Sequence, residues 1–367
     1  MKYDYLVIGA GLFGSIFAYE ANKLGKRVLV IESRNHIGGN CYSEKFEDYD
    51  IHKYGPHIFH TSKKYIWDYI NQFTEFNNFT LRNKAIYKNK LYSLPINLNT
   101  INQIYGVVSP KEAKEVIDKA KIHCDNPNNL EDYILSVVGP EIYEILIKGY
   151  TTKQWGKDPK QLPASIIKRL PIRFDYNDRY FPNSDIYEGI PVNGYTKIFE
   201  KMLDGINVSL STDYFNDRSY FDLLAEKVVY SGQIDRYFDY IHGDLEYRSL
   251  RHETILNKGD FQGTALINYT DSSIPYTRII QHKHFVFSNN ENDYITYEFP
   301  QNYKRGGQPF YPINDEVNNN KYKLYKNEAE KIYNLIIGGR LGNYRYYDMD
   351  MTIGNAISVV KKELAGN

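Results

Sequence analysis

Three glycines near the amino terminus have the spacing of a turn that binds a dinucleotide. Gly9, Gly11 and Gly14 form the pattern GxGxxG, and Glu32 closes the next apolar run. Two of the glycines let the backbone turn and approach a pyrophosphate, and the third lets a helix pack on a strand. The helix amino terminus favours the anion, and Glu32 would bind the adenosine ribose. A dinucleotide site is therefore predicted, with a glycine-rich turn that only caps a structural helix as the alternative.

A second candidate anion site lies near the carboxyl terminus. Gly338, Gly339 and Arg340 separate a short apolar run from the last predicted helix. A guanidinium at the end of a strand and beside a helix amino terminus can bind an anion. The alternative role for Arg340 is a surface salt bridge.

The elements around these glycines have the periodicities that such sites require. Apolar runs at 3–8 and 27–31 predict buried parallel strands, and a helix is expected between them from about 12 to 24. This strand, helix, strand unit would have a right-handed crossover. Residues 334–337 predict another short strand, and an amphipathic helix follows it. The chain is therefore expected to close its nucleotide domain with its own tail.

The middle of the chain has a different pattern. Residues 111–121 and 130–147 repeat apolar side chains at i, i+3, i+4 and i+7, which predicts helices of an inserted domain. Residues 173–189 mix aromatic and charged side chains without a period, as in a mobile loop that leads into short strands. Further strands are expected at 208–210, 227–230, 263–269, 277–281 and 294–299.

Composition excludes several classes of function. The 45 basic residues equal the 45 acidic ones, so no basic field indicates a nucleic-acid or membrane partner. The two cysteines, Cys41 and Cys124, cannot build a tetrahedral metal site or a disulfide framework, and no metal is expected. The first apolar run is too short for a signal peptide or a membrane span. A cytoplasmic protein is predicted.

Residues 33–40, which follow Glu32 directly, indicate which dinucleotide is bound. They resemble the E-x-R-x-x-x-G-G extension of FAD enzymes related to the amine oxidases, an extension that NAD enzymes usually lack. Gly338, Gly339 and Arg340 resemble the second FAD contact of that group. The resemblance implies FAD as the cofactor.

Six further stretches make the resemblance more specific. They are His52 to Thr61 (HKYGPHIFHT), Lys148 to Gly156 (KGYTTKQWG), Ile167 to Arg173 (IKRLPIR), Glu246 to Leu250 (EYRSL), Pro275 to Lys283 (PYTRIIQHK) and Arg345 to Met349 (RYYDM). With the glycine fingerprint they span the chain from end to end. The sequence resembles the UDP-galactopyranose mutases of bacteria.

That resemblance implies a multidomain α/β (α+β) fold and a homodimer. The expected domains are an FAD-binding Rossmann-like domain (1–80, 200–235 and 330–367), an inserted helical domain (97–170, with a mobile loop at 165–178) and an antiparallel β-sheet substrate domain (80–96, 178–200 and 236–330).

The resemblance also implies the reaction, a reversible ring contraction of UDP-galactopyranose to UDP-galactofuranose. In this family the sugar forms a covalent adduct with N5 of reduced FAD, with no net redox change. An external reductant such as NAD(P)H would keep the flavin reduced, and the product would supply galactofuranose for cell-surface polysaccharide. Since the leaving UDP carries the developing charge, the strongest demand on the protein is for cations directed at the diphosphate.

The site residues are carried over from the family by position. The catalytic residues would be Arg169 in the mobile loop, Arg278 and His57. Substrate would contact Tyr150, Thr151 and Trp155, which match the uridine subsite of the family, and also Tyr180, Arg248, Asn268, Tyr311 and Tyr346. The cofactor would contact Gly9, Gly11, Phe13, Gly14, Glu32, Ser33, Arg34, Gly38, Gly39, Asn40, Gly55, His57, His60, Arg340, Tyr346, Asp348 and Met349.

These roles have simpler structural alternatives. A guanidinium can bind phosphate oxygens in a bidentate way, but Arg169 and Arg278 could instead be exposed ion-pair partners. Each tyrosine could pack in the core. His57 and His60 could be ordinary core histidines, because their spacing shows no metal pair. No carboxylate stands out as a general acid or base, which fits a mechanism in which the flavin itself transfers the proton.

Three alternative functions remain open from the sequence. UDP-N-acetylgalactosamine could be the substrate of the same reaction, because the acetamido group is recognised by pocket shape rather than by a motif. An amine-oxidase-like FAD oxidoreductase would have an aromatic cage around the flavin and no diphosphate arginines. A non-catalytic nucleotide-sugar or FAD-binding regulator would lose the loop arginine.

Overall fold

The computed structural model describes residues 2–168 and 172–364, and its contacts separate them into two compact units. The first unit comprises Met1–Asn77, Tyr187–Tyr247 and Pro309–Asn367. The second comprises Asn78–Ile186 and Arg248–Gln308. The chain therefore crosses between the units four times, and each unit is built from segments that are distant in sequence. The division into three domains at the boundaries given above stays a prediction.

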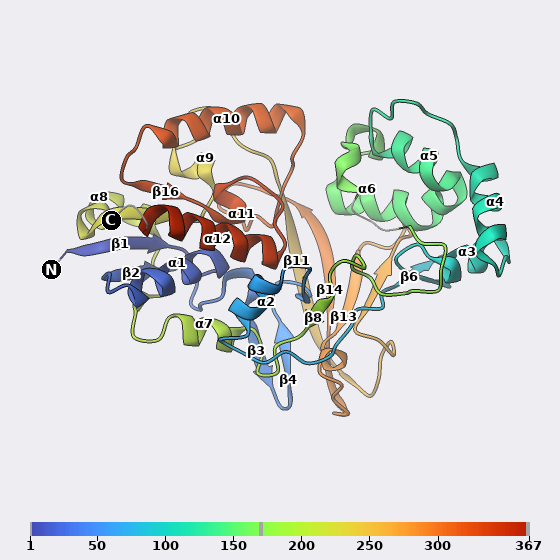
Figure 1. The fold of residues 1–367 in the computed structure, drawn as a ribbon, viewed down its shortest axis with the longest axis horizontal. Coiled ribbons are helices and arrows are strands. Elements are labelled where there is room, and N and C mark those ends of the chain that lie inside the picture. The colour runs from blue at the N-terminus through green and yellow to red at the C-terminus, as the bar shows by residue number, and fades with distance from the viewer. Residues whose placement is uncertain (1, 169–171, 365–367) are drawn as a thin grey trace. The chain divides into compact units, whose positions relative to one another are not determined.

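A parallel sheet of five strands forms the centre of the first unit (Figure 1). Its order is β16 (Leu335–Ile337), β10 (Ala225–Tyr230), β1 (Tyr3–Ile8), β2 (Val28–Ile31) and β9 (Asn207–Ser209), and every neighbouring pair is parallel. These strands form where the sequence has short apolar runs, as expected for strands covered on both faces. The expected Rossmann-like arrangement is confirmed.

Side chains alternate between two cores along these strands. Val7, Val30 and Val229 face a core that contains helices α1 (Leu12–Lys23) and α12 (Met349–Leu364), which run beside each other in Figure 1. Leu6 and Ile31 face the opposite core, which is rich in buried tyrosines. The carboxyl-terminal helix therefore packs against the first helix of the chain.

The remaining elements of the first unit are short, except for helix α10. Its strands are β3 (Ser43–Phe46), β4 (Tyr49–His52), β5 (Phe59–Thr61), β8 (Tyr187–Gly189) and β15 (Tyr311–Pro312). Its helices are α2 (Lys64–Ile70), α7 (Thr196–Met202), α8 (Arg218–Leu224), α9 (Ile234–Tyr237), α10 (Glu316–Glu330) and α11 (Gly339–Gly342), with 3-10 turns at Gly39–Cys41 and Tyr214–Asn216.

The second unit combines a sheet with a group of helices. The sheet order is β11 (Tyr247–Lys258), β14 (Asn292–Asn302), β13 (Arg278–Gln281), β12 (Leu266–Tyr269), β6 (Lys84–Tyr87) and β7 (Lys90–Ser93). The neighbouring pairs are antiparallel except for β6 and β12, which are parallel. The expected antiparallel sheet is thus a mixed one, because β6 joins it from a distant part of the chain.

The helices of this unit are α3 (Leu98–Tyr105), α4 (Pro110–Ala120), α5 (Leu130–Ile142) and α6 (Gly149–Trp155), with a π-helical stretch at Tyr143–Lys148 and 3-10 turns at Pro159–Gln161, Ala164–Ile166 and His282–Phe285. The continuous helix expected at 130–147 is interrupted. Gly139 has φ 81° and precedes Pro140, and a Cβ atom on Gly139 would lie 2.6 Å from the carbonyl oxygen of Ala120. Close packing against α4 therefore accompanies the break.

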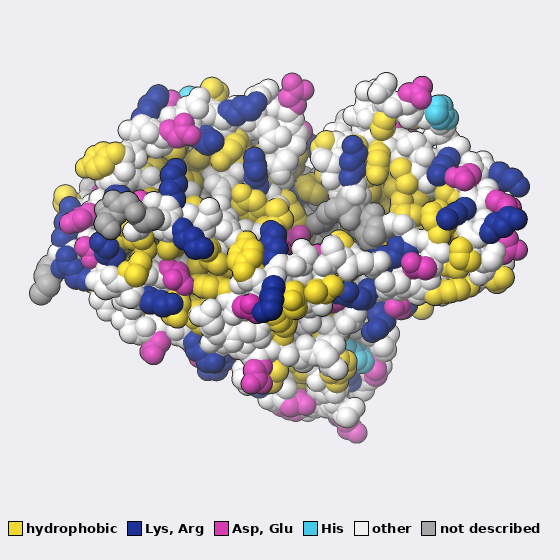
Figure 2. Space-filling model, in the orientation of Figure 1, with side chains coloured by type: hydrophobic (Ala, Val, Ile, Leu, Met, Phe, Trp, Pro, Cys, Tyr) yellow, Lys and Arg dark blue, Asp and Glu magenta, His cyan; other side chains and the backbone are white. Residues whose placement is uncertain are grey.

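Surface charge is mixed. On the face shown in Figure 2, basic and acidic side chains are interspersed over the described residues rather than gathered into a basic patch. Among the described helices, none has both the length and the apolar run that a membrane crossing requires.

Candidate functional site

The glycine fingerprint forms a tight turn between β1 and α1. Gly9 has φ +104°, a conformation that favours glycine, and its Cβ atom would lie 2.4 Å from Ser231 Oγ. A Cβ atom on Gly14 would lie 2.0 Å from the carbonyl oxygen of Gly9. Side chains at these two positions would push the helix away from the strand. Gly11 is the residue before the first turn of α1, where backbone N–H groups can bind an anion.

Glu32 is buried at the end of β2 and organises this turn. Its Oε2 accepts a hydrogen bond from the backbone N–H of Ala10 at 2.9 Å. Its Oε1 accepts from the backbone N–H of Arg34 at 2.9 Å and from Ser33 Oγ at 3.2 Å. Each carboxylate oxygen can accept more than one hydrogen bond, so contact with a ribose hydroxyl remains chemically possible.

A second glycine turn packs directly on the first. Gly38 and Gly39 have φ values of +92° and +56°, and Gly38 donates from its N–H to the carbonyl oxygen of Ala10 at 2.8 Å. A Cβ atom on Gly39 would lie 2.9 Å from the Cα atom of Gly11. The two backbones therefore approach closely because neither carries a side chain at the contact.

Arg34 places a free donor in the same region. Its Nη2 donates to Asn40 Oδ1 at 2.9 Å, and the guanidinium lies 4.4 Å from the centre of the Tyr54 ring. Its Nη1 is buried and has no hydrogen-bond partner within the described parts of the chain. A buried guanidinium nitrogen of this kind suits an anionic oxygen. The cradle of glycines and this donor together fit the pyrophosphate of a dinucleotide.

The carboxyl-terminal glycine turn lies on Phe13 of α1. A Cβ atom on Gly338 would lie 2.0 Å from the Phe13 ring, and Gly339 has φ +77°. Arg340 follows and donates from Nε and Nη2 to the carbonyl oxygen of Tyr347, at 3.1 and 2.5 Å. Its guanidinium is 5.2 Å from the centre of the Tyr346 ring.

Two expected tyrosines lie next to Arg340. The rings of Tyr311 and Tyr346 are stacked with their centres 5.4 Å apart. The other two expected residues of this segment lie at the start of α12, where Met349 is the first helical residue and Asp348 accepts from the Thr352 N–H through its carbonyl oxygen. The first unit thus brings the expected cofactor residues of the carboxyl-terminal segment to one place.

The two histidines of the YGPHIFH stretch have separate environments. Gly55 has φ +93°, and its carbonyl oxygen lies 2.9 Å from His57 Nδ1, which fixes the orientation of that ring. His60 lies in β5, opposite Glu188 of β8. Their predicted contacts with the flavin or the sugar stay predictions.

In the second unit, helix α6 and strand β13 bring expected substrate residues together. Arg278 donates from Nη2 to the Tyr150 hydroxyl at 2.5 Å. Burial raises the pKa of Tyr150 to about 12, although the charge of Arg278 opposes the shift. Thr151 and Trp155 lie on the same short helix. A neutral hydroxyl and a guanidinium therefore lie side by side.

Glu298 of β14 is a site residue that sequence reasoning missed. It is 1% exposed and forms an ion pair with Arg278 Nε at 2.9 Å. Burial alone would raise the pKa of this carboxyl, but Arg278 and His252 more than offset it, so the pKa is lowered. The only sequence signal was an acidic residue within a run of apolar strand residues, and β13 and β14 had to pair before it could reach Arg278.

Arg248 and Asn268 lie on two strands of the same sheet, β11 and β12, which β14 and β13 separate. Arg248 is 5% exposed and donates from Nε to the carbonyl oxygen of Gln154 at 2.9 Å and from Nη2 to that of Lys153 at 3.2 Å. Asn268 pairs with Arg278 in the sheet, and its buried Oδ1 has no partner within the described residues. The amide of Asn268 therefore keeps hydrogen-bonding capacity for a ligand.

Tyr180 and Arg169 are the last two of the expected residues. Tyr180 packs against the helical core of the second unit, and its backbone N–H donates to the carbonyl oxygen of Leu81 at 2.8 Å. Arg169 lies outside the described residues. Its predicted role stays a prediction.

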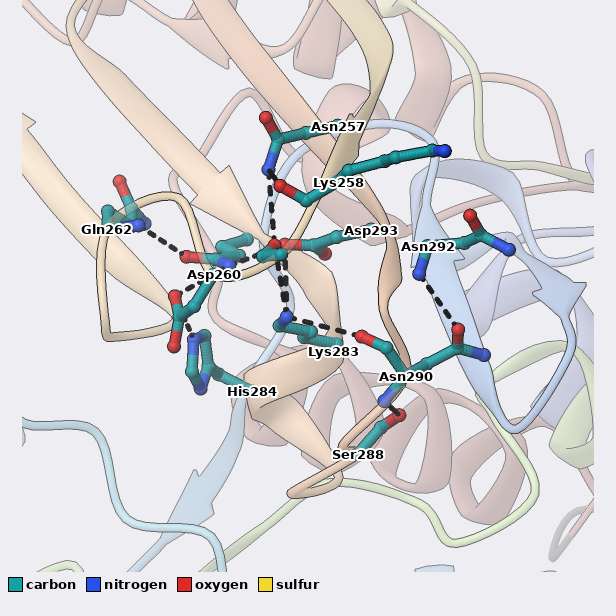
Figure 3. A network of polar contacts seen from close by, with 12 residues as sticks. Asn257, Lys258, Asp260, Gln262, Lys283, His284, Ser288, Asn290, Asn292 and Asp293 are labelled. Atoms are coloured by element: carbon teal, nitrogen blue, oxygen red, sulfur yellow. Dashed lines mark hydrogen bonds and ion pairs between the residues drawn. The ribbon is translucent and has the colours of Figure 1, made fainter.

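One motif lies apart from these residues. The QHK end of PYTRIIQHK leads into a polar network near the end of β11 and the start of β14 (Figure 3). Lys283 forms an ion pair with Asp293 at 3.7 Å, and both are buried. Asp260 accepts from Gln281 Nε2 at 2.9 Å and contacts His284 Nε2 at 3.1 Å. This part of the motif therefore forms contacts within the second unit.

Comparison with known proteins identifies relatives over the whole chain. Residues 145–346 match the family model for UDP-galactopyranose mutase, and residues 7–73 match that for an NAD(P)-binding Rossmann-like domain. The chain is 39% identical to a probable UDP-galactopyranose mutase of Klebsiella pneumoniae, over 99% of this chain and 95% of that protein. It is 37% identical to a dTDP-fucopyranose mutase of Escherichia coli, over 99% and 98% of the two chains.

Solved structures support the fold. A reduced UDP-galactopyranose mutase matches with a TM-score of 0.79 at 14% identity, covering 100% of this chain and 96% of that one. A putrescine oxidase variant matches with a TM-score of 0.60 at 12% identity, covering 100% and 99%. At these identities the likeness concerns the fold alone.

Proposed function

This chain belongs to the UDP-galactopyranose mutase family, and from that membership we propose that it interconverts UDP-galactopyranose and UDP-galactofuranose. It is an enzyme of the isomerase type. The observation that carries the proposed substrate is the 39% identity to the Klebsiella protein over nearly the full length of both chains.

The proposed cofactor is FAD in its reduced form. The glycine turns at Gly9 and Gly39 leave room for a pyrophosphate, and the free Nη1 of Arg34 would donate to it. Glu32 would accept from the ribose. When bound and reduced, FAD supplies a nucleophilic nitrogen for the anomeric carbon of the sugar.

The protein's own contribution would be to bind the diphosphate and stabilise its charge as it leaves. Arg278 would donate to the phosphate oxygens, and Glu298 would hold its guanidinium in place from the opposite side. The Asn268 amide would add a neutral hydrogen bond to the diphosphate, and the Tyr150 hydroxyl would help to orient the Arg278 guanidinium. Arg169 would supply a second guanidinium.

Several finer properties belong to the same proposal. We infer an external reductant such as NAD(P)H, a homodimeric assembly and a cytoplasmic location. The product would supply galactofuranose for cell-surface polysaccharide.

A second candidate substrate has a specific observation behind it. The Escherichia coli relative named dTDP-fucopyranose mutase is 37% identical, almost as similar as the Klebsiella protein. A dTDP-linked 6-deoxy sugar is therefore a candidate alongside UDP-galactose, as is UDP-N-acetylgalactosamine. The reaction type would be the same for all three.

The first experiment is anaerobic incubation of the purified protein with UDP-galactofuranose, with and without dithionite, followed by chromatography of the sugar nucleotides. We expect conversion to UDP-galactopyranose only with reduced flavin. The dTDP-fucose and UDP-N-acetylgalactosamine pairs are assayed in parallel. No conversion of any of the three would refute the proposal.

Arg278 is tested separately by Arg278→Ala and Arg278→Lys. Both variants should retain FAD, and turnover should fall about 10²- to 10³-fold in Arg278→Ala because one charge-stabilising donor is lost. Arg278→Lys keeps a charge opposite Glu298 but loses bidentate geometry, so its turnover should be intermediate. Arg169→Ala is assayed beside them. Normal turnover in Arg278→Ala would overturn this assignment.

A further inference from the structure

Lys153 of α6 makes an unusual set of contacts. Its Nζ donates to four backbone carbonyl oxygens, those of Tyr269 at 2.7 Å, Asp271 at 2.8 Å, Ile274 at 3.0 Å and Tyr276 at 3.0 Å. Tyr269 is the last residue of β12, and the other three residues lie in the connection between β12 and β13. An ammonium has three donor hydrogens, so four acceptors surround it completely.

This connection joins two strands that carry proposed ligand-binding residues. β12 carries Asn268 and β13 carries Arg278, the two residues proposed to bind the diphosphate. The helix that carries Lys153 also carries Tyr150 and Trp155, which are expected at the nucleoside end of the substrate. Lys153 therefore links helix α6, which is expected to contact the nucleoside, to strands β12 and β13, which are proposed to bind the diphosphate.

Other contacts also hold α6 against the sheet. A Cβ atom on Gly149 would lie 2.2 Å from the carbonyl oxygen of Thr270, so the start of the helix touches the connection directly. Arg248 donates to the carbonyl oxygens of Gln154 and Lys153 at the helix end. Lys153 lies between these two contacts along the helix, and its charged side chain adds a further contact to the connection.

The chemical state of Lys153 agrees with this role. Burial lowers the pKa of Lys153 to about 8, and the carboxylate of Asp271 opposes that shift. The side chain is thus mainly an ammonium near pH 7. Removing it would leave four carbonyl oxygens without their shared donor.

We propose that Lys153 is a positioning residue, which holds the nucleoside-binding helix at a fixed spacing from the diphosphate-binding strands so that both halves of a nucleoside diphosphate bind at once. This inference rests on the proposed function. Two linked subsites bind a ligand far more tightly than either alone, but only if their spacing matches the ligand. Lys153 maintains the spacing of the two subsites and does not contact the reacting atoms.

The test uses the FAD-loaded, oxidised protein and three probes: UDP, uridine and inorganic pyrophosphate. Their dissociation constants are measured by calorimetry or by competition for wild type, Lys153→Met and Lys148→Met. Lys148→Met is the matched control, because Lys148 lies on the preceding turn, is half exposed and pairs with the surface residue Glu144 at 2.9 Å.

We expect Lys153→Met to weaken UDP binding by about 10- to 100-fold. Uridine and pyrophosphate should each change by less than about threefold, because each subsite stays intact and only the spacing is lost. Lys148→Met should match wild type for all three probes. FAD absorbance and the urea midpoint are recorded for each protein to verify folding.

Lys153→Arg provides a second test in case Lys153→Met does not fold. It keeps the charge and several donors but has a wider, planar head group. It should show the same pattern with a smaller loss for UDP, about 3- to 10-fold.

Two results would overturn the inference while leaving the proposed function intact. One is unchanged UDP binding in a folded Lys153→Met protein. The other is a loss for uridine as large as that for UDP, which would place Lys153 within the nucleoside subsite. Failure of the wild-type protein to bind UDP would overturn both the inference and the proposed UDP substrate.

Discussion

Several buried and half-buried cations in the described structure bind main-chain oxygens. Lys153 donates to four carbonyl oxygens, Arg248 to two, and Arg173 to those of Asn177, Arg179 and Phe181. Arg340 likewise donates to the carbonyl oxygen of Tyr347. These side chains fix irregular backbone segments, where carbonyl groups lack partners in a helix or sheet.

Arg34 differs from these residues, and a prediction follows from that difference. Its Nη1 is buried without a protein partner in the described structure, so it is available to an anionic ligand. Arg34→Met should weaken FAD binding by about 10- to 100-fold, the worth of one charge-assisted hydrogen bond. FAD retained after dialysis is measured by absorbance.

The control for this prediction is Arg27→Met, which removes an exposed arginine paired with Asp4 on the same domain. It should retain FAD like wild type. Equal retention in Arg34→Met and wild type would show that Nη1 makes no contact with the cofactor.

At the scale of elements, a buried ion pair supports one end of the sheet in the second unit. Lys283 and Asp293 are both buried, and Lys283 also donates to the carbonyl oxygens of Gly259 and Asn290 at 3.2 and 3.3 Å (Figure 3). Removal of one partner from a buried pair leaves an uncompensated charge. These contacts hold Lys283, which follows β13 and lies five residues beyond Arg278.

Lys283→Met should therefore destabilise the protein by about 3 to 5 kcal/mol at neutral pH. Burial raises the pKa of Asp293 above its usual value, so the folded state holds this proton more tightly than the unfolded state. Stability from this group falls as pH rises through the raised pKa. Loss of Lys283 enlarges that fall, and the penalty should shrink in acid, where Asp293 is protonated.

Urea unfolding at pH 5 and pH 8 measures both effects. Lys258→Met, which removes an exposed lysine at the end of the neighbouring strand β11, should stay close to wild type at both pH values. A penalty in Lys283→Met that is independent of pH would show that Asp293 does not carry the cost.

At the scale of the whole molecule, the candidate residues separate by unit. The glycine turns, Arg34 and Arg340 belong to the first unit, whereas Tyr150, Asn268 and Arg278 belong to the second. Each unit has its own core, so each can present its residues on a rigid support. The residues proposed to bind the cofactor and those proposed to bind the diphosphate therefore belong to different units of the fold.

Hydrogen exchange of the holoprotein should reveal this separation. FAD should protect amides of the first unit around the β1 to α1 turn, relative to protein stripped of flavin. Addition of UDP should protect α6 and the β12 to β13 connection, because ligand binding stabilises the elements that it contacts. Protection by UDP that is confined to the first unit would contradict the assignment of the diphosphate residues.

Local patterns in the sequence were sufficient for much of the first unit. The apolar runs predicted β1, β2, β10 and β16 to within about two residues, and the glycine spacing predicted the turn before α1. Such features depend on neighbours in sequence: a buried strand needs consecutive apolar residues, and a tight turn needs glycine at specific positions. The family resemblance then supplied the candidate site residues in both units.

Tertiary structure alone decided the contacts between distant segments. Glu298 became a partner of Arg278, and Lys153 a partner of four carbonyl oxygens, only after β12, β13, β14 and α6 had come together. The parallel pairing of β6 with β12 and the break at Gly139 arise in the same way, from close approach of segments far apart in the chain. Periodicity describes which face of an element is buried, but it does not specify which element covers that face. For this reason the sequence determined the elements and the kind of chemistry, and the fold decided which charged groups hold one another in place.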